Sequence, residues 1–133
     1  MRIHTPVIAA VALALSGARA VAGDVFVICN PGVTLQASEA KDVFIGEKGF
    51  AGSVKLVPAD NSAAQADFLA KVLKIDAGKY SGIWTKKSFR DGANPPPVKA
   101  SDGEAVAFVK STAGACSYVG SAPAAGVTVV GKF

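Results

Sequence analysis

The chain has 133 residues, half of them hydrophobic, and its 14 Lys and Arg against 10 Asp and Glu give a formal net charge of +4 at pH 7. This length is sufficient for one domain with a single hydrophobic core. The densest basic spot, Lys86-Lys87, is not part of a basic cluster interleaved with aromatic residues, which excludes nucleic acid as an expected partner.

The first 22 residues have the pattern of a secretory signal peptide. Arg2 supplies a short positive region, Val7 to Leu15 is a compact apolar core, and small residues permit cleavage after Ala20 or Ala22. This apolar run is shorter than the roughly 20 residues that span a bilayer. We therefore expect residues 23–133 to form one exported, soluble, periplasmic domain without a membrane span. Two arginines leave with the signal, so the remaining 12 basic and 10 acidic residues give a formal charge of +2.

Candidate catalytic and metal-binding side chains are few in the expected mature chain. The only histidine, His4, lies in the signal segment, which leaves no Ser-His-Asp triad, Cys-His pair or His-based zinc site. The acidic residues are scattered, and Cys29 and Cys116 lack a CxxC spacing. We therefore expect no enzyme, with no catalytic residue, no metal site and no cofactor. For the cysteines, an exported protein favours a structural disulfide, and two buried free thiols are the alternative.

The domain begins with a predicted strand and a predicted short helix. Residues 24–29 contain a nearly continuous apolar run, which is typical of a strand covered on both faces. A helix follows, with Ser38 as its expected N-cap and Gly46 at its C-terminal end. Its inward face is formed by Ala40, Val43 and Phe44.

The stretch from Val54 to Leu73 carries the functional prediction. A short β-prone run ends at Pro58, because proline lacks the N–H that a continuing ladder needs. Three residues that favour helix N-caps follow, namely Asp60, Asn61 and Ser62. Apolar residues then recur at helical spacing over 64–73. A strand that leads through a polar turn into a helix presents free amides and a positive dipole end to an anion, whereas the simpler interpretation is that Ser62 is only an N-cap.

The rest of the chain completes an α/β pattern. Residues 76–89 form a helical stripe that includes Trp84, interpreted as a core anchor, and 91–97, DGANPPP, forms an exposed stiff loop. Ser101 and Glu104 have the spacing of a capping box that starts a further helix, and strands at 115–119 and 127–130 end the chain. The order β-α-β-α-α-α-β-β predicts a three-layer α/β domain in which helices flank a mixed β-sheet.

From Val25 to Val130 the sequence resembles the phosphate-binding periplasmic protein family, the substrate-binding components of phosphate ABC transporters. The resemblance is carried by the strand VFVICNP, the helix SEAKDVFIGE, the turn PADNSAAQADF, the segment from Trp84 to Phe89, and TAGACSYV, in this order. It implies a single lobe of the type II periplasmic-binding-protein fold, similar to the short single-lobe relatives of that family.

The resemblance also implies that an anion binds at the turn before the second helix. The implied ligand-binding residues are Asp60, Asn61, Ser62, Ala63 and Ala64. The family turn typically reads Arg-x-Asp-x-Ser-Gly-Thr, and Pro58 stands here in place of the arginine, with two alanines in place of the glycine and threonine. Because the lost guanidinium would make a bidentate contact to phosphate, we expect weak binding of phosphate or another oxyanion.

Two functions are therefore expected from the sequence. The first is a periplasmic solute-binding-type protein that binds or senses an oxyanion weakly, with tighter binding when homodimerisation or a membrane transporter or sensor subunit supplies a second lobe. The alternative is an accessory or interaction protein that retains the lobe fold, binds no ligand and partners a membrane sensor or transporter.

A disulfide between Cys29 and Cys116 is predicted from the exported location and from the expected neighbouring strands. The resembling family usually has apolar residues at these two positions. Closing so long a loop constrains the unfolded chain by roughly 4 kcal/mol in the entropy model.

Overall fold

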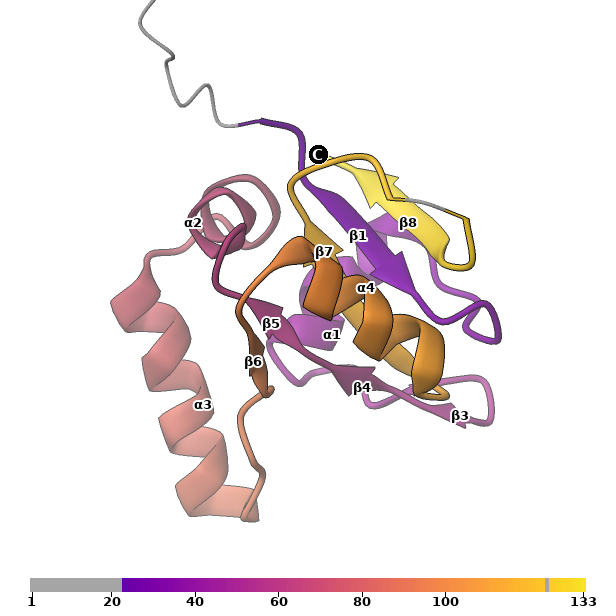
Figure 1. The fold of residues 1–133 in the computed structure, drawn as a ribbon. Coiled ribbons are helices and arrows are strands. Elements are labelled where there is room, and N and C mark those ends of the chain that lie inside the picture. The colour runs from indigo at the N-terminus through magenta and orange to yellow at the C-terminus, as the bar shows by residue number, and fades with distance from the viewer. Residues whose placement is uncertain (1–22, 124) are drawn as a thin grey trace, which may run out of the picture.

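The computed structural model describes residues 23–123 and 125–133, and it shows a mixed α/β fold (Figure 1). The predicted signal peptide lies outside the described residues, so its cleavage stays a prediction. The central sheet has the strand order β4-β7-β1-β8. Its strands are β4 (Val57–Pro58), β7 (Ala115–Val119), β1 (Phe26–Cys29) and β8 (Thr128–Lys132). β1 runs antiparallel to β7 and β8, while β4 runs parallel to β7, which confirms the predicted mixed sheet.

Helices pack against both faces of this sheet. On one face, α1 (Ala40–Phe44), α2 (Gln65–Phe68) and the π-helix η2 (Leu69–Leu73) form a core with Val27 and Tyr118. On the other face, α4 (Asp102–Ser111) buries Ala105 and Val109 against Ile28. Alternate residues of β1 therefore enter opposite cores, which explains why its sequence is apolar throughout.

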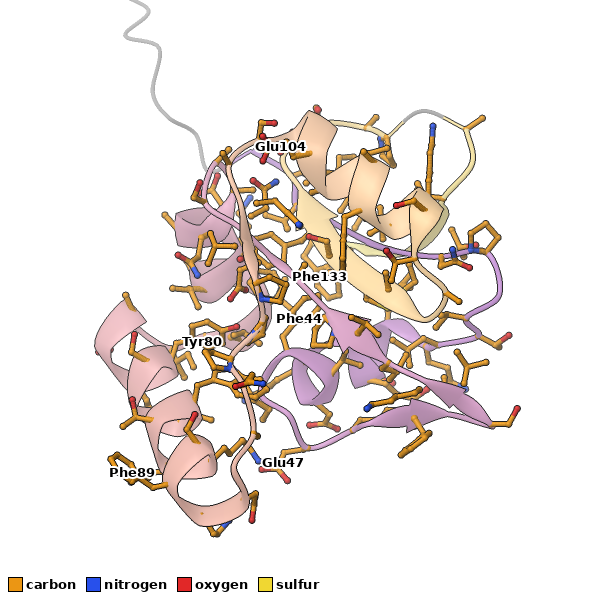
Figure 2. All side chains as sticks on the ribbon, turned by 60° about the horizontal axis from the view of Figure 1, so that its bottom comes forward. Phe44, Glu47, Tyr80, Phe89, Glu104 and Phe133 are labelled. Carbon is orange, nitrogen blue, oxygen red and sulfur yellow. A yellow bond between two sulfur atoms is a disulfide. The ribbon has the colours of Figure 1, made fainter. Side chains whose placement is uncertain are left out.

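The longest helix, α3 (Ala77–Asp91), lies at the side of the molecule next to β5 (Asp60–Asn61) and β6 (Val98–Lys99) (Figure 1). Asp76 caps its N-terminus by accepting a hydrogen bond from the Lys79 amide at 2.7 Å. Figure 2 shows Tyr80 directed toward the core and Phe89 directed away from it. Tyr80 therefore anchors one face of α3 to the core. Near the C-terminal end of the helix, Phe89 is 89% exposed.

The prediction that the strand ends at Pro58 is confirmed, since β4 spans Val57–Pro58. The amides of Val57 and Ala59 donate to carbonyls of the β7 segment, at 2.9 and 2.8 Å, so the nitrogen of Pro58 faces away from that ladder. Beyond it the chain stays extended, and β5 pairs in parallel with β6 through the amides of Asp60 and Ser62, at 2.8 and 2.9 Å. Proline is tolerated here because β4 is an edge strand of the four-stranded sheet.

The predicted cap at Ser38 is wrong. A 3₁₀ turn, η1 (Ala37–Glu39), precedes α1, with Gln36 as N-cap, and the Glu39 carboxylate accepts from the Gln36 amide at 3.1 Å. Because the Glu39 carboxylate accepts from the Gln36 amide, the cap lies two residues before Ser38, and Ser38 is inside the 3₁₀ turn. A hairpin of β2 (Phe50–Ala51) and β3 (Val54–Lys55) then leads to β4.

The predicted cap of α4 is confirmed. Ser101 is its N-cap and accepts a hydrogen bond from the Glu104 amide at 3.2 Å. The Glu104 carboxylate accepts from the Ala100 amide at 2.9 Å, one residue before the amide that the capping box predicts.

The predicted disulfide between Cys29 and Cys116 is confirmed. The two residues are directly opposite in the antiparallel register of β1 and β7, and both are fully buried. Among residues 23–123 and 125–133, none of the helices combines the length and the apolar character needed to cross a membrane.

Candidate functional site

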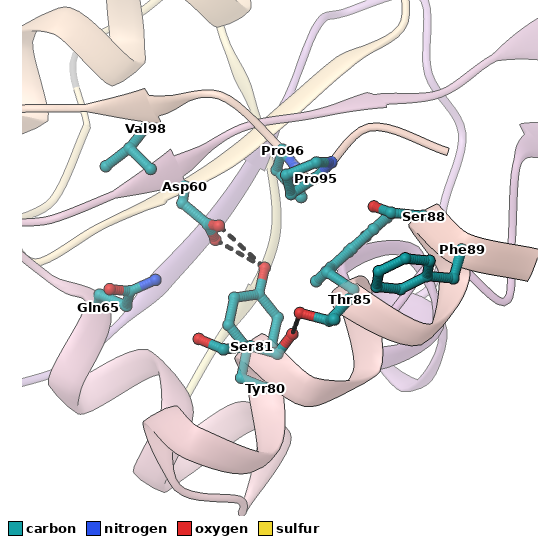
Figure 3. Close-up of a pocket in the computed structure, with 11 residues that line it drawn as sticks. Asp60, Gln65, Tyr80, Ser81, Thr85, Ser88, Phe89, Pro95, Pro96 and Val98 are labelled. Atoms are coloured by element: carbon teal, nitrogen blue, oxygen red, sulfur yellow. Dashed lines mark hydrogen bonds between the residues drawn. The ribbon is translucent and has the colours of Figure 1, made fainter. Parts of the chain in front are cut away.

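Asp60 is a buried carboxylate held between three elements. It extends from β5, and its side chain faces Tyr80 of α3 (Figure 3). Tyr118 of β7 contacts the same carboxylate. The Tyr80 hydroxyl donates to both carboxylate oxygens, at 3.0 and 2.9 Å, and the Tyr118 hydroxyl donates to Oδ1 at 2.9 Å. Only 3% of Asp60 is exposed. The two phenols therefore replace most of the water that would otherwise surround this charge.

The aromatic core fixes the position of one of these phenols. The Tyr118 ring stacks on Phe68 at 3.7 Å between centroids and meets the edge of Phe44 at 5.5 Å. Because side chains alternate along β7, Tyr118 and Cys116, two residues apart, face the same core. The hydroxyl can then reach β5, which lies beside β7.

Burial sets the electrostatics of the cluster. Loss of hydration raises the pKa of Asp60 above its ordinary value, and the hydrogen bonds from the two tyrosines partly oppose that rise. The pKa values of Tyr80 and Tyr118 are also raised, first by burial and then by the neighbouring carboxylate, so both phenols stay protonated near neutral pH. In the described part of the chain, the ion pairs do not include Asp60.

A cavity of about 520 Å³ opens beside this carboxylate, and we refer to it as the Asp60 cavity (Figure 3). Its walls come from β5, the start of α2, one side of α3 and the proline-rich loop that leads into β6. The lining residues are Asp60, Gln65, Tyr80, Ser81, Trp84, Thr85, Ser88, Phe89, Pro95, Pro96 and Val98.

Most polar donors around the Asp60 cavity are already engaged. The hydroxyls of Thr85 and Ser88 donate to the carbonyls of Ser81 and Ala93, at 2.9 and 2.7 Å. The Trp84 indole N–H donates to the Phe44 carbonyl at 3.1 Å. The cavity therefore presents a carboxylate, hydroxyl groups, the Gln65 carboxamide and apolar surface to a ligand.

The structure divides the predicted ligand residues between the core and the surface. Asp60, Asn61 and Ala64 are buried, whereas Ser62 and Ala63 are exposed. The Asn61 amide donates to the carboxylate of Asp102 at 2.8 Å and to a β7 carbonyl at 3.0 Å. Asn61 thus links β5, α4 and β7 and does not face solvent.

The backbone amides of the turn have acceptors within the protein. The Ser62 amide donates to the Lys99 carbonyl at 2.9 Å, the Ala63 amide to Asn61 Oδ1 at 3.1 Å, and the Ala64 amide to the Asn61 carbonyl at 3.1 Å. The interpretation of Ser62 as an N-cap is wrong, because Ala64 is the N-cap of α2 and the Ser62 hydroxyl donates to the Lys99 carbonyl at 3.2 Å. Anion binding at this turn stays a prediction.

The sequence analysis missed the two tyrosines as partners of Asp60. Tyr80 and Tyr118 lie 20 and 58 residues further along the chain. The sequence offers only a general indication of this contact, because any buried tyrosine hydroxyl needs a hydrogen-bond partner. That indication does not say which of the acidic residues supplies it.

The fold and the site together define a mixed α/β domain with a buried carboxylate beside an open cavity. A comparison with protein-family models found no match, and neither did a comparison with curated proteins. The resemblance to phosphate-binding periplasmic proteins therefore stays a proposal.

Proposed function

We propose that this chain is an exported solute-binding-type protein, a single lobe similar to those of the phosphate-binding periplasmic family. The observation that carries the proposal is the path of residues 57–73, in which a strand parallel to β7 leads through an exposed turn into α2. Ligands of open α/β sheets bind beyond the carboxyl ends of such strands. The signal-peptide pattern and the disulfide support an exported location.

The solute that the resemblance implies is phosphate or a similar oxyanion, bound weakly at Ser62 and Ala63. A helix N-terminus contributes about 0.3 to 2 kcal/mol to anion binding. Each hydrogen bond to a charged group contributes about 1.5 to 3 kcal/mol. Three such contacts, less an association cost of at least about 4 kcal/mol, correspond to a dissociation constant near millimolar. The engaged amides of the turn support weak binding, because an anion must compete with their present acceptors.

Calorimetric titration of the purified protein with phosphate and with sulfate tests this proposal. We expect millimolar binding that Ser62→Ala weakens several-fold. Ser53→Ala, at an exposed serine in the hairpin between β2 and β3, is the matched control and leaves binding unchanged. Sub-micromolar binding by a monomer, or equal binding by the Ser62→Ala variant, shows that the oxyanion site is elsewhere.

A second candidate function is an accessory protein that binds no oxyanion and partners a membrane sensor or transporter. The occupied amides of Ser62, Ala63 and Ala64 favour it, since the turn is satisfied without a ligand. A ligand that binds only the native state raises the melting temperature. This candidate therefore predicts no thermal shift with either anion, together with cross-linking of the exported protein to a membrane component.

A further inference from the structure

The Asp60 cavity has a negative charge in its wall, as does a smaller cavity of about 270 Å³ that Asp102 lines. Among the eleven described residues that line the Asp60 cavity, Asp60 is the only acidic one and none is Lys, Arg or His. Two other cavities, of about 370 and 380 Å³, are each lined by three lysines. These are Lys41, Lys71 and Lys74 in one, and Lys48, Lys55 and Lys87 in the other. An anion is therefore repelled from the Asp60 cavity, and a cation is attracted to it.

The carboxylate of Asp60 has acceptor capacity that its present partners do not use. A carboxylate offers about four lone-pair positions. In the described structure two phenol donors serve both oxygens, and Oδ2 is contacted by Tyr80 alone. Both donors are neutral, whereas buried charges in proteins are usually paired with an opposite charge. The raised pKa of Asp60 agrees with a carboxylate that lacks such a counter-charge.

The remaining walls suit the organic part of a cation. Tyr80, Trp84 and Phe89 supply aromatic surface, and Pro95 and Val98 supply apolar surface. Aromatic faces attract ammonium groups, and apolar side chains pack against hydrocarbon. The volume of about 520 Å³ lies within the roughly 300 to 1,000 Å³ of typical small-molecule sites. A divalent metal ion fits poorly, because it needs several oxygen ligands of which the cavity supplies one carboxylate.

We propose that the Asp60 cavity binds a small organic cation, a protonated amine whose ammonium group donates to Asp60 while its apolar body packs on Trp84 and Phe89. This site shares Asp60 with the ligand residues that the resemblance implies, but the exposed Ser62 and Ala63, where the oxyanion is proposed to bind, are not among its lining residues. Amine binding and phosphate binding can therefore be tested separately.

Three phenylalkyl probes of similar size and different charge test the proposal by calorimetry or ligand-observed NMR at pH 7. They are 2-phenylethylamine, which is cationic, 2-phenylethanol, which is neutral, and 3-phenylpropanoate, which is anionic. We expect the amine to bind at least about tenfold more tightly than the alcohol, and the carboxylate to bind least, because only the amine brings a positive charge to the Asp60 carboxylate. Equal binding of the amine and the alcohol, or tighter binding of the carboxylate, overturns the proposal.

Two substitutions connect the effect to the cavity. Asp60→Asn keeps an acceptor for the tyrosines and removes the charge, so it should weaken amine binding about tenfold and alcohol binding much less. Thr85→Lys places a cation in the cavity from an exposed helical position and should abolish amine binding, while Thr85→Gln, its matched neutral control, should retain it. If Asp60→Asn does not fold, the comparison of Thr85→Lys with Thr85→Gln still tests the site. Wild-type amine affinity in Thr85→Lys refutes the site.

Discussion

Replacing Tyr118 by phenylalanine isolates one bond of the Asp60 cluster. Tyr118 is fully buried, and its ring packs on Phe68 and Phe44, contacts that a phenylalanine ring preserves. The substitution removes only the hydroxyl that donates to Asp60 Oδ1 at 2.9 Å. Its effect on stability therefore reports how strongly a buried phenol supports this carboxylate.

The expected loss is about 2 to 3 kcal/mol of unfolding free energy at pH 7. A hydrogen bond to a charged group contributes about 1.5 to 3 kcal/mol, and loss of one partner leaves the other group buried with reduced satisfaction. The loss should lie at the upper end of that range because, in the variant, Asp60 keeps only Tyr80 as a donor. Tyr80→Phe should cost a similar amount, since this hydroxyl contacts both carboxylate oxygens.

The loss of unfolding free energy in Tyr118→Phe should increase as the pH rises. The folded protein raises the pKa of Asp60 above 3.8, so stability from this residue is fully present below 3.8 and is lost as pH rises through the folded-state pKa. The Tyr118 hydroxyl lowers that pKa, and the variant therefore raises it further. Each additional unit corresponds to about 1.4 kcal/mol once Asp60 is ionised. The difference between wild type and variant should consequently be larger at pH 7 than at pH 3.5.

Urea unfolding followed by the fluorescence of Trp84 measures both values, because this single tryptophan is mostly buried beside the cluster. Ser111→Ala is the control, since it removes an exposed hydroxyl bonded to the Ala107 carbonyl and should change stability by less than about 0.5 kcal/mol. The reasoning is refuted by a Tyr118→Phe variant as stable as wild type at pH 7. It is equally refuted by a loss of the same size at both pH values.

Reducing the Cys29–Cys116 disulfide, which spans 87 positions, should lower the unfolding free energy by about 4 to 5 kcal/mol; two titratable thiols in denatured, non-reduced protein would contradict the bond. Gly114→Ala should cost about 3 kcal/mol or more, since Gly114 has φ +79° and an added Cβ overlaps the Lys55 carbonyl. Gly92→Ala, at φ +68° in open space, should cost only about 1 to 2 kcal/mol, and equal losses in urea unfolding would contradict the steric argument.

The elements that sequence patterns predicted well are those determined by local chemistry. The strand predicted at 115–119 is β7, and the helix predicted at 76–89 is α3 with Asp76 as its cap. Short-range capping explains the start of α4, where Ser101 accepts from the Glu104 amide as their spacing indicates. For the two helices the deciding cap hydrogen bonds lie within a few residues of one another, whereas β7 is recognised by its apolar, β-prone sequence.

The features that sequence patterns missed depend on distant partners. Pro58 ends β4 as predicted, but the amides on either side of it donate to β7, more than 50 residues away in sequence. β5 exists only because Val98 and Lys99 pair with it, and that pairing follows a proline-rich loop with no strand signal. Residue types near 60–62 favour helix caps, and the parallel ladder overrides that preference.

The role of Asp60 changes when its surroundings are considered together. The resemblance places an arginine at position 58, where this chain has proline, so a guanidinium that could neutralise Asp60 is absent. Tyr80 and Tyr118 satisfy the hydrogen bonds of the carboxylate but not its charge. The residue that the motif associates with an oxyanion site therefore leaves a net negative charge next to a cavity without cations. Because the sign of that charge determines which ligand can enter, a proline where the resemblance implies an arginine supports the proposals of a cationic solute at this cavity and of weak anion binding at the turn.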